Sequence, residues 1–505
     1  MDLTVLNLAV PHLSADLRPS GSQLLWIVDI YGFLVAGSLI TMGTLGDRIG
    51  RRRLLLIGAA AFGIASVVAA FSTSAEMLIA ARALLGVAGA TLAPSTLALI
   101  SNMFRDPRQR TFAIGIWITS FSAGAAIGPL LGGLLLEYFW WGSVFLLAVP
   151  VMLLLLALGP VLLPEFRDPD AGRLDLISAA LSLVAVLAGI YGLKQIAEDG
   201  PGWRPISFIL AGLAIGFVFV RRQTTLPDPL IDLRLFRLPA FSTSLAIITL
   251  GFGGAFGAML FIAQYLQLVL GLSPLRAGLW TLPSAGAFIV GSMLTPVILR
   301  WARPTDIMAG GMALAAIGFG LLTQIDRGSE LAILVIGSVV YSLGLSPVAT
   351  VATDLIVGSA PPERAGAASA ISETSFEFGG AFGIAVLGSI GTAIYRRQMD
   401  DALPTGLSAE AAEAARDTAG GALAAGEQLP DQLGAVVIAA AREAFTQGLQ
   451  LTVAISAVVA AVSALLAVVL LRRARANDEV DAQPDPVDPV QGGACGAVVG
   501  IDRDL

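Results

Sequence analysis

Two carboxylates lie inside one long apolar segment, where an ionisable side chain is expensive and is therefore a candidate for function. Glu373 and Glu377 stand four residues apart in the stretch Ser-Glu-Thr-Ser-Phe-Glu, a spacing that puts both on one face of a helix. Two carboxylates this close in a medium of low dielectric constant do not both stay ionised easily, so at least one is expected to exchange protons. The chemistry that this pattern predicts is proton exchange in competition with the binding of a cation.

A further acid, Asp29, falls near one end of an apolar run close to the N-terminus. Trp26 and Tyr31 lie beside it in the sequence, and their rings can stack on a flat cation. These three residues are therefore candidates for binding a cation or a proton. A carboxylate that only caps a helix at the membrane interface is the other interpretation of Asp29.

One arginine, Arg82, stands within the apolar segment 77–100. A buried guanidinium is costly unless it faces a cavity or a carboxylate, so partners inside the protein are expected to hold it. A purely structural role, with hydrogen bonds to neighbouring backbone, is the alternative to a functional one.

A charged turn, residues 43–53, separates two apolar runs, 24–42 and 54–71, that are each about the length needed to span a bilayer. Its sequence is Gly-Thr-Leu-Gly-Asp-Arg-Ile-Gly-Arg-Arg-Arg. Clustered arginines place such a loop on the cytoplasmic side of a membrane. An arginine cluster that only sets topology is one interpretation, but the ordered spacing of Gly, Asp, Gly and Arg favours a more specific role.

A pattern of small residues runs from Gly124 through Gly128, Pro129 and Gly132 to Gly133. Small side chains let two helix backbones approach closely, and a proline removes one helical hydrogen bond. The pattern therefore predicts a bend at a helix contact. A generic packing face is the alternative interpretation.

The composition restricts the class of protein. The chain has 505 residues, of which 56% are hydrophobic and 13% are charged, and its apolar runs are repeatedly about twenty residues long. These features indicate an all-α polytopic membrane protein without room for a soluble catalytic domain. One cysteine and one histidine exclude an internal disulfide and an imidazole cluster for zinc. The net charge of −7 argues against nucleic-acid binding, and we expect no cofactor.

The apolar runs predict fourteen membrane spans if residues 1–13 are an incomplete first span. This segment is too short to cross about 30 Å of hydrocarbon, so we expect a further apolar segment upstream of Met1. With both termini in the cytoplasm, most loop arginines fall on the cytoplasmic side, which favours that orientation. The stretch 396–447 is then a long outer loop, with helical runs expected at 408–425 and 433–445.

The turn at 43–53 resembles the loop that joins the second and third transmembrane helices in the major facilitator superfamily. The stretches 2–11 and 23–31 are similar to the first two helices of its fourteen-helix drug:proton antiporters of the QacA type. Arg82 matches the fourth-helix arginine motif of proton-coupled members, and the pattern at 124–133 matches the antiporter motif of exporters. The resemblance covers about residues 1–475.

The resemblance implies the major facilitator fold, with six-helix halves at 1–163 and 223–475 and two inserted transmembrane helices at 164–222. Residues 476–505 are expected to form a disordered cytoplasmic tail. For the outer loop at 396–447 the resemblance implies a helical hairpin, which could serve as a lid or as a passive spacer.

The resemblance also assigns roles to single residues. It implies that Asp2 is an intramembrane carboxylate that binds cation or proton, and that Arg82 couples proton movement to transport. It further implies that Asp47, Arg48 and Arg51 form a charge relay that locks and releases the cytoplasmic gate.

The function implied is proton-coupled efflux of lipophilic cationic drugs, dyes and antiseptics across the cytoplasmic (inner) membrane of a bacterium, by a monomer. The expected partners are protons, lipophilic cations and the lipid bilayer. Dedicated export of an endogenous lipid, siderophore or antibiotic is the alternative, and a transport-dead sensor ranks lower because the acids are retained. An ATP-driven pump is excluded because the chain lacks a Gly-x-x-x-x-Gly-Lys-Ser/Thr loop. No acid occurs at 284–292, where some family members carry one, so the choice between monovalent and divalent cations stays open.

Overall fold

The computed structural model describes residues 21–167, 175–200, 202–226, 229–325, 330–404 and 407–481, together with a few separate positions before residue 21. All regular structure within this part is helical, which confirms the predicted all-α class. Asp2 and most of the predicted first span lie outside the described residues.

The helices of the N-terminal part follow one another with short connections. They are α2 (Gly21–Ile49), α3 (Arg51–Ala70), α4 (Ala75–Met103), α5 (Pro107–Tyr138), α6 (Ser143–Leu146), α7 (Ala148–Leu162), α8 (Leu176–Asp199) and α9 (Trp203–Gln223). The remaining elements include three short helices of other types, η1 and η3 (3₁₀) and η2 (π). They are η1 (Leu233–Arg237), α10 (Pro239–Gln264), η2 (Tyr265–Val269), α11 (Pro274–Ile298), α12 (Pro304–Leu322), α13 (Glu330–Gly358), η3 (Pro362–Arg364), α14 (Ala365–Ala402), α15 (Ala409–Asp417), α16 (Ala419–Gln428) and α17 (Asp431–Asp481).

Twelve segments of the described chain are long and apolar enough to cross a membrane. The 32-residue helix α5 is not among the twelve, but it packs against α11 and α13 within the same bundle. The protein is therefore a polytopic helical membrane protein, whereas the predicted total of fourteen spans stays a prediction.

Several helices begin where the sequence supplies a capping side chain. Asp106 accepts hydrogen bonds from the backbone N–H groups of Arg108 and Gln109 at the start of α5, where Pro107 occupies the first helical position. Ser74 caps α4 in the same way through the N–H of Met77. Such caps satisfy N–H groups that have no partner within the helix, which fixes where these spans start.

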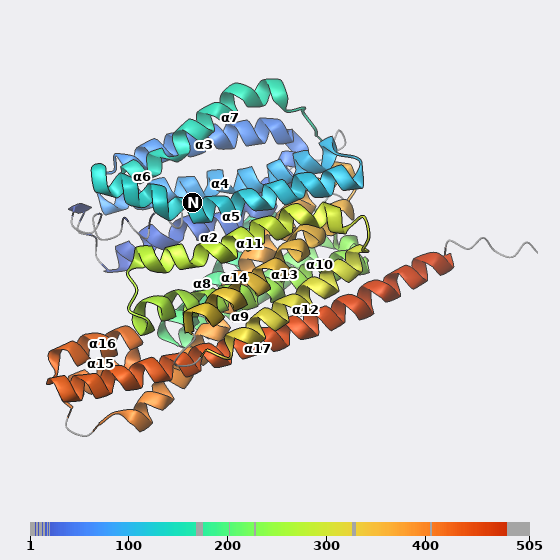
Figure 1. The fold of residues 1–505 in the computed structure, drawn as a ribbon. Helices are drawn as coiled ribbons and strands as arrows, with labels where there is room; N and C mark the ends of the chain where they lie inside the picture. Colours follow the sequence, from blue (N-terminus) through green and yellow to red (C-terminus); the bar gives the residue numbers. More distant parts are fainter. Residues whose placement is uncertain are drawn as a thin grey trace, which may run out of the picture.

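The long helices run side by side in one bundle, with α3 and α7 on one side and α12 and α17 on the opposite side (Figure 1). Helix α14 lies centrally, because it contacts α2, α4, α8, α10 and α17. We call the end of the bundle at which α2 ends and α14 begins the Asp47 end. Helices α15 and α16 follow the other end of α14, so they lie away from the Asp47 end and beside the first part of α17 (Figure 1).

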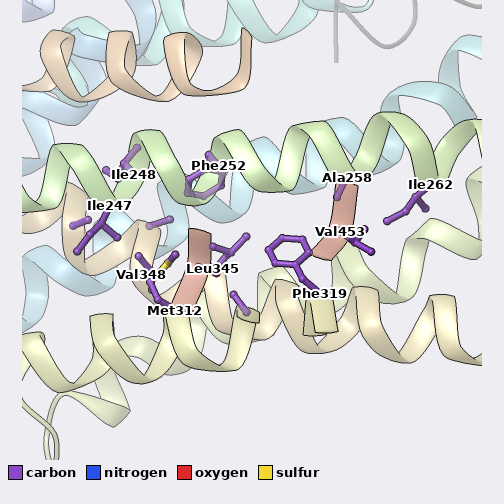
Figure 2. Close-up of a cluster of buried hydrophobic side chains, with 14 of the residues drawn as sticks. Ile247, Ile248, Phe252, Ala258, Ile262, Met312, Phe319, Leu345, Val348 and Val453 are labelled. Atoms are coloured by element: carbon purple, nitrogen blue, oxygen red, sulfur yellow. The ribbon is translucent and has the colours of Figure 1, made fainter. Parts of the chain in front are cut away.

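A buried apolar core fills the space around α10. Figure 2 shows Ile247 of α10 turned toward Val348 of α13 and Met312 of α12, with Leu345 of α13 next to Met312. Phe319 of α12 extends the same cluster and is almost completely buried. This packing makes α10, α12, α13 and α17 one continuous block.

The described chain departs from the expected outer loop in two places. The run expected at 408–425 is divided, because Thr418 ends α15 and caps α16 through the N–H of Gly421. The run expected at 433–445 is not separate but forms the beginning of α17, which is 51 residues long. Helix α17 also continues past the predicted boundary at 475 as far as Asp481, and residues 482–505 lie outside the described part.

Candidate functional site

Helices α2 and α14 approach most closely at two glycines. A Cβ atom on Gly43 would overlap the carbonyl oxygen of Gly366, and a Cβ on Gly366 would overlap both the Gly43 carbonyl and the Asp47 carboxylate. Only residues without side chains allow this approach. The first glycine of the charged turn therefore brings Asp47 to the beginning of α14.

The Asp47 carboxylate binds the N-terminus of α14. Its Oδ1 accepts a hydrogen bond from the N–H of Gly366 and its Oδ2 accepts one from the N–H of Ala367, each at 3.0 Å. These N–H groups belong to the first turn of α14, where the helix dipole favours a negative charge. Asp47 is only 4% exposed, so this contact is shielded from water.

Arg51 neutralises Asp47 and binds three further groups. Its Nη2 lies 2.7 Å from Asp47 Oδ1, and Nη1 donates to the Ala98 carbonyl of α4. Nη2 also donates to the carbonyls of Pro362 and Glu363, at 2.7 and 3.2 Å. Arg51 is 1% exposed and thus ties α3, α2, α4 and η3 together. A loop arginine that only set topology would not need to be buried with these partners.

The remaining arginines of the turn are placed differently. Arg48 lies half-buried in the last turn of α2, while Arg53 is exposed. The first N–H groups of α3 are bound by the segment after α7: Arg51 N donates to the Phe166 carbonyl, and Arg52 N and Arg53 N donate to the Glu165 carboxylate. Gly50, with φ 111°, provides the sharp turn that this contact requires.

A second polar contact joins distant parts of the chain at the same end. Arg110 Nε of α5 lies 2.5 Å from Asp354 Oδ1 of α13, and Thr111 Oγ1 donates to Asp354 Oδ2 at 2.9 Å. Both Asp354 oxygens are thus occupied by residues of α5. Because α5 and α13 belong to different predicted halves, this contact and the Asp47–α14 contact both link the halves.

The two acids of the predicted proton site lie on α14, beyond the residues that bind Asp47. Glu373 is half-buried and Glu377 is exposed. Ala370 contacts Gly43 of α2, and Ala381 packs against a cluster that includes Phe33 of α2. The helical period places both acids between these two contacts, on the side of α14 that faces α2.

Aromatic rings surround this part of α14. The centre of the Phe376 ring lies 4.4 Å from the centre of the Phe252 ring and 5.6 Å from the centre of the Phe256 ring, and both partners belong to α10. Thr249 of α10 donates to the carbonyl of Ser375. The acids are therefore held on a helix that is fixed against α10 by an aromatic cluster.

Arg82 and Tyr31 meet on the side of α2 that faces α4. Arg82 is fully buried, donates from Nη2 to the Val28 carbonyl at 3.2 Å and stands 5.2 Å from the centre of the Tyr31 ring. A Cβ on Gly86 would overlap the backbone of Tyr31, so α4 also packs closely here. Tyr31 thus contacts α4, whereas Trp26 is 45% exposed and packs edge-on against Phe33. Asp29 lies on α2, and its side chain is outside the described part.

The glycine-proline pattern lies within α5, which runs through it without a break in secondary structure. Gly128 and Gly132 are buried and Gly124 is half-buried, but Gly133 is exposed and a Cβ there would meet nothing within 4 Å. Close packing therefore does not explain Gly133. The close approach of α5 to α11 is instead at Gly115, whose Cβ would lie 3.0 Å from the Ser292 carbonyl oxygen.

The structure adds residues that the sequence did not single out. Two of them contact the charged turn: Gly366 binds Asp47, and Glu165 binds the first N–H groups of α3. The third, Asp354, binds Arg110 at the same end. None of the three belongs to a recognisable motif. Each of these residues lies more than 100 positions from its partner in the chain, so no short sequence pattern indicates the pairing. Within the described residues, no three His, Cys, Asp or Glu side chains gather so as to hold a metal ion.

Residues 1–384 match the family model described as Major Facilitator Superfamily. The multidrug efflux pump LfrA of Mycolicibacterium smegmatis is 44% identical over 94% of this chain and 94% of its own length. The methyl viologen resistance protein SmvA of Salmonella typhimurium is 37% identical over 88% of this chain and 90% of its own length. The tetracenomycin C resistance and export protein of Streptomyces glaucescens is 32% identical, with 96% and 91% covered.

Among solved structures, the human organic anion transporter MFSD10 superposes with a TM-score of 0.57 over 92% of this chain and 89% of that one. The two sequences are 16% identical, so this likeness concerns the fold alone.

Proposed function

The chain belongs to the Major Facilitator Superfamily and is a membrane transporter, not an enzyme, and from this premise we propose that it exports lipophilic cationic drugs in exchange for protons. The names of the Mycolicibacterium and Salmonella relatives, which concern multidrug efflux and methyl viologen resistance, support the substrate class. The proposed location is the bacterial cytoplasmic membrane, with the Asp47 end facing the cytoplasm.

One observation carries the proposal: a single helix, α14, bears both the gate contact and the acids. The N–H of Ala367 binds Asp47, and Glu373 follows six residues later, about 9 Å along the helix axis. A change of charge at Glu373 or Glu377 therefore acts on the same rigid helix whose N-terminus is held by Asp47. Such an element can link occupancy of the cavity to opening of the gate.

The transport cycle follows from these residues. A lipophilic cation in a low-dielectric cavity needs a carboxylate partner, which Glu373 and Glu377 provide, and aromatic rings such as Phe376 contribute to binding a flat cation. Protons entering from outside neutralise the acids and displace the cation. The gate at Asp47 and Arg51 then opens, the protons leave to the cytoplasm, and a new cation enters.

The decisive experiment measures ethidium transport by the purified protein in proteoliposomes with and without an imposed pH gradient. We expect gradient-dependent transport that Asp47→Asn or Arg51→Ala lowers by about tenfold or more, since each removes charge-assisted hydrogen bonds at the gate. Ethidium affinity should change by less than about twofold because the gate lies away from the acids. Arg53→Gln is the matched control, since Arg53 is exposed and binds Glu165 through its backbone.

Transport that ignores the pH gradient would overturn the proton-coupled mechanism. Affinity lost together with transport in Asp47→Asn would place Asp47 in the binding site and not at a gate. The alternative function, dedicated export of an endogenous compound, is supported by the name of the Streptomyces glaucescens relative. It predicts that ethidium and methyl viologen are not transported, whereas one compound from the host's own extract is.

A further inference from the structure

A polar cluster joins the two helices, α8 and α9, at the Asp47 end. Asp175 caps α8 through the N–H of Ile177, accepts from Ser178 Oγ and pairs with Arg222 Nε of α9 at 2.8 Å. Next to this pair, Gln223 Nε2 donates to Ser178 Oγ at 2.8 Å. The ends of α8 and α9 are therefore fixed to each other by side chains.

Gln223 extends this cluster into the segment that leads to α10. Its Oε1 accepts a hydrogen bond from the backbone N–H of Leu230 at 2.7 Å. Gln223 is 3% exposed and Leu230 is 2% exposed. Both polar groups of this contact are thus withdrawn from water, where an unpaired N–H is costly.

The segment 229–238 touches both sides of the gate. The Thr44 hydroxyl of α2, one turn before Asp47, donates to the Ile40 carbonyl at 2.9 Å and shares this hydrogen with the Leu230 carbonyl at 3.3 Å. Asp232 pairs with Arg364 at 3.5 Å. In the sequence, Arg364 stands between the Glu363 carbonyl, which binds Arg51, and the Gly366 N–H, which binds Asp47. Leu230 also belongs to the buried core around α10, so its position is fixed from several sides.

We propose that Gln223 is a positioning residue for the gate and that, through Leu230, it couples the α8–α9 pair to the closed contact between α2 and α14. The inference rests on the proposed function and gives the two inserted helices a role in it. Gln223 holds the backbone of Leu230 at the place where its carbonyl meets Thr44. Loss of the hydrogen bond between Gln223 and Leu230 shifts the gate toward its open state.

The test uses accessibility of the gate itself. In the full chain with Cys495→Ser, Ala367→Cys serves as reporter, because the side chain of Ala367 is only 6% exposed while its N–H binds Asp47. Labelling by a maleimide is measured in everted vesicles. Gln223→Met, which keeps the length of the side chain and removes its hydrogen bonds, should raise the labelling rate by about tenfold, with a matching fall in maximal transport rate and little change in KM.

The matched control is Gln450→Met. Gln450 also donates to a backbone carbonyl, that of Ile325, at 2.8 Å, but at the opposite end of the bundle. The Gln450→Met variant should therefore be labelled at the same rate as the parent. Thr44→Val removes the other end of the same chain of hydrogen bonds, and the double variant with Gln223→Met should be no more accessible than the stronger single variant.

Three results would overturn the inference. The first is labelling of folded Gln223→Met at the parent rate, and the second is an equal increase in the labelling rate of Gln450→Met. The third is a double variant whose increase in labelling rate equals the product of the increases in Thr44→Val and Gln223→Met. If Gln223→Met does not fold, Thr44→Val decides, because unchanged labelling there contradicts the coupling. Labelling does not depend on the substrate, so a failure of drug transport in the parent would overturn the proposed function while this test still reports on the gate.

Discussion

Gly43 of α2 and Gly366 of α14 face each other so closely that a Cβ atom on either would overlap the carbonyl oxygen of the other. This approach lets Asp47 reach the N–H groups of Gly366 and Ala367. The contact that we propose as the gate therefore depends on two residues without side chains as much as on its charged groups. Any conformation that separates α2 from α14 relieves the need for glycine at both positions.

We expect Gly366→Ala to destabilise the closed gate specifically. The added methyl group overlaps the Asp47 carboxylate and the Gly43 carbonyl, and steric overlap of this kind in a packed core costs about 1–3 kcal/mol. Transport should fall by about tenfold or more, while the protein still assembles because the open state accepts alanine. Gly310→Ala in α12 is the control, since a Cβ there meets nothing within 4 Å. Equal transport by the two variants would show that the close approach is not needed.

The contact between Arg110 and Asp354 should behave as a second link between the halves. Their side chains are 21% and 15% exposed, and a partly buried charge that loses its partner costs about 1–3 kcal/mol. Arg110→Gln and Asp354→Asn should each lower the maximal transport rate by about tenfold, and the double variant should be less impaired than the product of the two. Additive effects in this cycle would mean that the two residues act independently.

A surface pair provides the control for that cycle. Arg396 and Asp417 lie 3.3 Å apart near the opposite end of the bundle, with side chains that are 50% and 59% exposed. Exposed pairs contribute about 0–1 kcal/mol. Arg396→Gln should therefore leave transport within about twofold of the parent.

The sequence alone predicted those features that local chemistry determines. Apolar runs of membrane length gave the helical class, and Asp47 and Arg51 stood out because charges are rare in such a chain. The partners of these charges were not predictable, since Gly366 is one of 56 glycines and lies more than 300 residues from Asp47 in the chain. A hydrogen bond to a backbone N–H carries no side-chain signal at all.

The misplaced elements have equally local reasons. Alanine-rich sequence around 408–425 favours a helix throughout, but the side chain of Thr418 caps a new helix and divides it. The run at 433–445 joins the last span because no proline interrupts the chain there, and Gly448, which lies between the two, stays helical where its backbone comes close to that of Gly391. The glycines at 124–133 predicted close packing, yet Gly133 faces open space, because small residues occur both at contacts and elsewhere.

Asp175 should not contribute to the pH dependence of transport in the physiological range. The hydrogen bond from Arg222 lowers the pKa of Asp175 from 3.8 to about 2. A group with a lowered pKa stabilises the fold fully above its ordinary pKa and loses that contribution only as the pH falls through the lowered value. The pH profile of Asp175→Asn between about pH 5.5 and 8 should therefore run parallel to that of the parent, at a lower rate. A flattened profile would mean that Asp175 titrates during transport.

The acids on α14 should determine the pH dependence instead. In the proposed mechanism cation and proton compete for the same carboxylate. Ethidium affinity of the parent should therefore weaken as the pH falls, by up to about tenfold per pH unit once the protonated form dominates. Glu373→Gln should bind ethidium more weakly at neutral pH and show a flatter response. Glu443→Gln is the control, since Glu443 is an exposed acid in the first part of α17.

Asp29 and Glu373 are expected to differ in the range of substrates that they affect. Glu373 lies on the helix that carries the gate contact, so Glu373→Gln should reduce proton-driven efflux of every cation tested, by about tenfold or more. Asp29 lies near Trp26 and Tyr31 at the start of α2, so Asp29→Asn should reduce efflux of some cations much more than that of others. The measurement is efflux of ethidium and methyl viologen at several pH values. If Glu373→Gln, Glu377→Gln and the double variant all transport with unaltered rate and pH response, the proton site is not on α14 and the coupling acid must be Asp2 or Asp29.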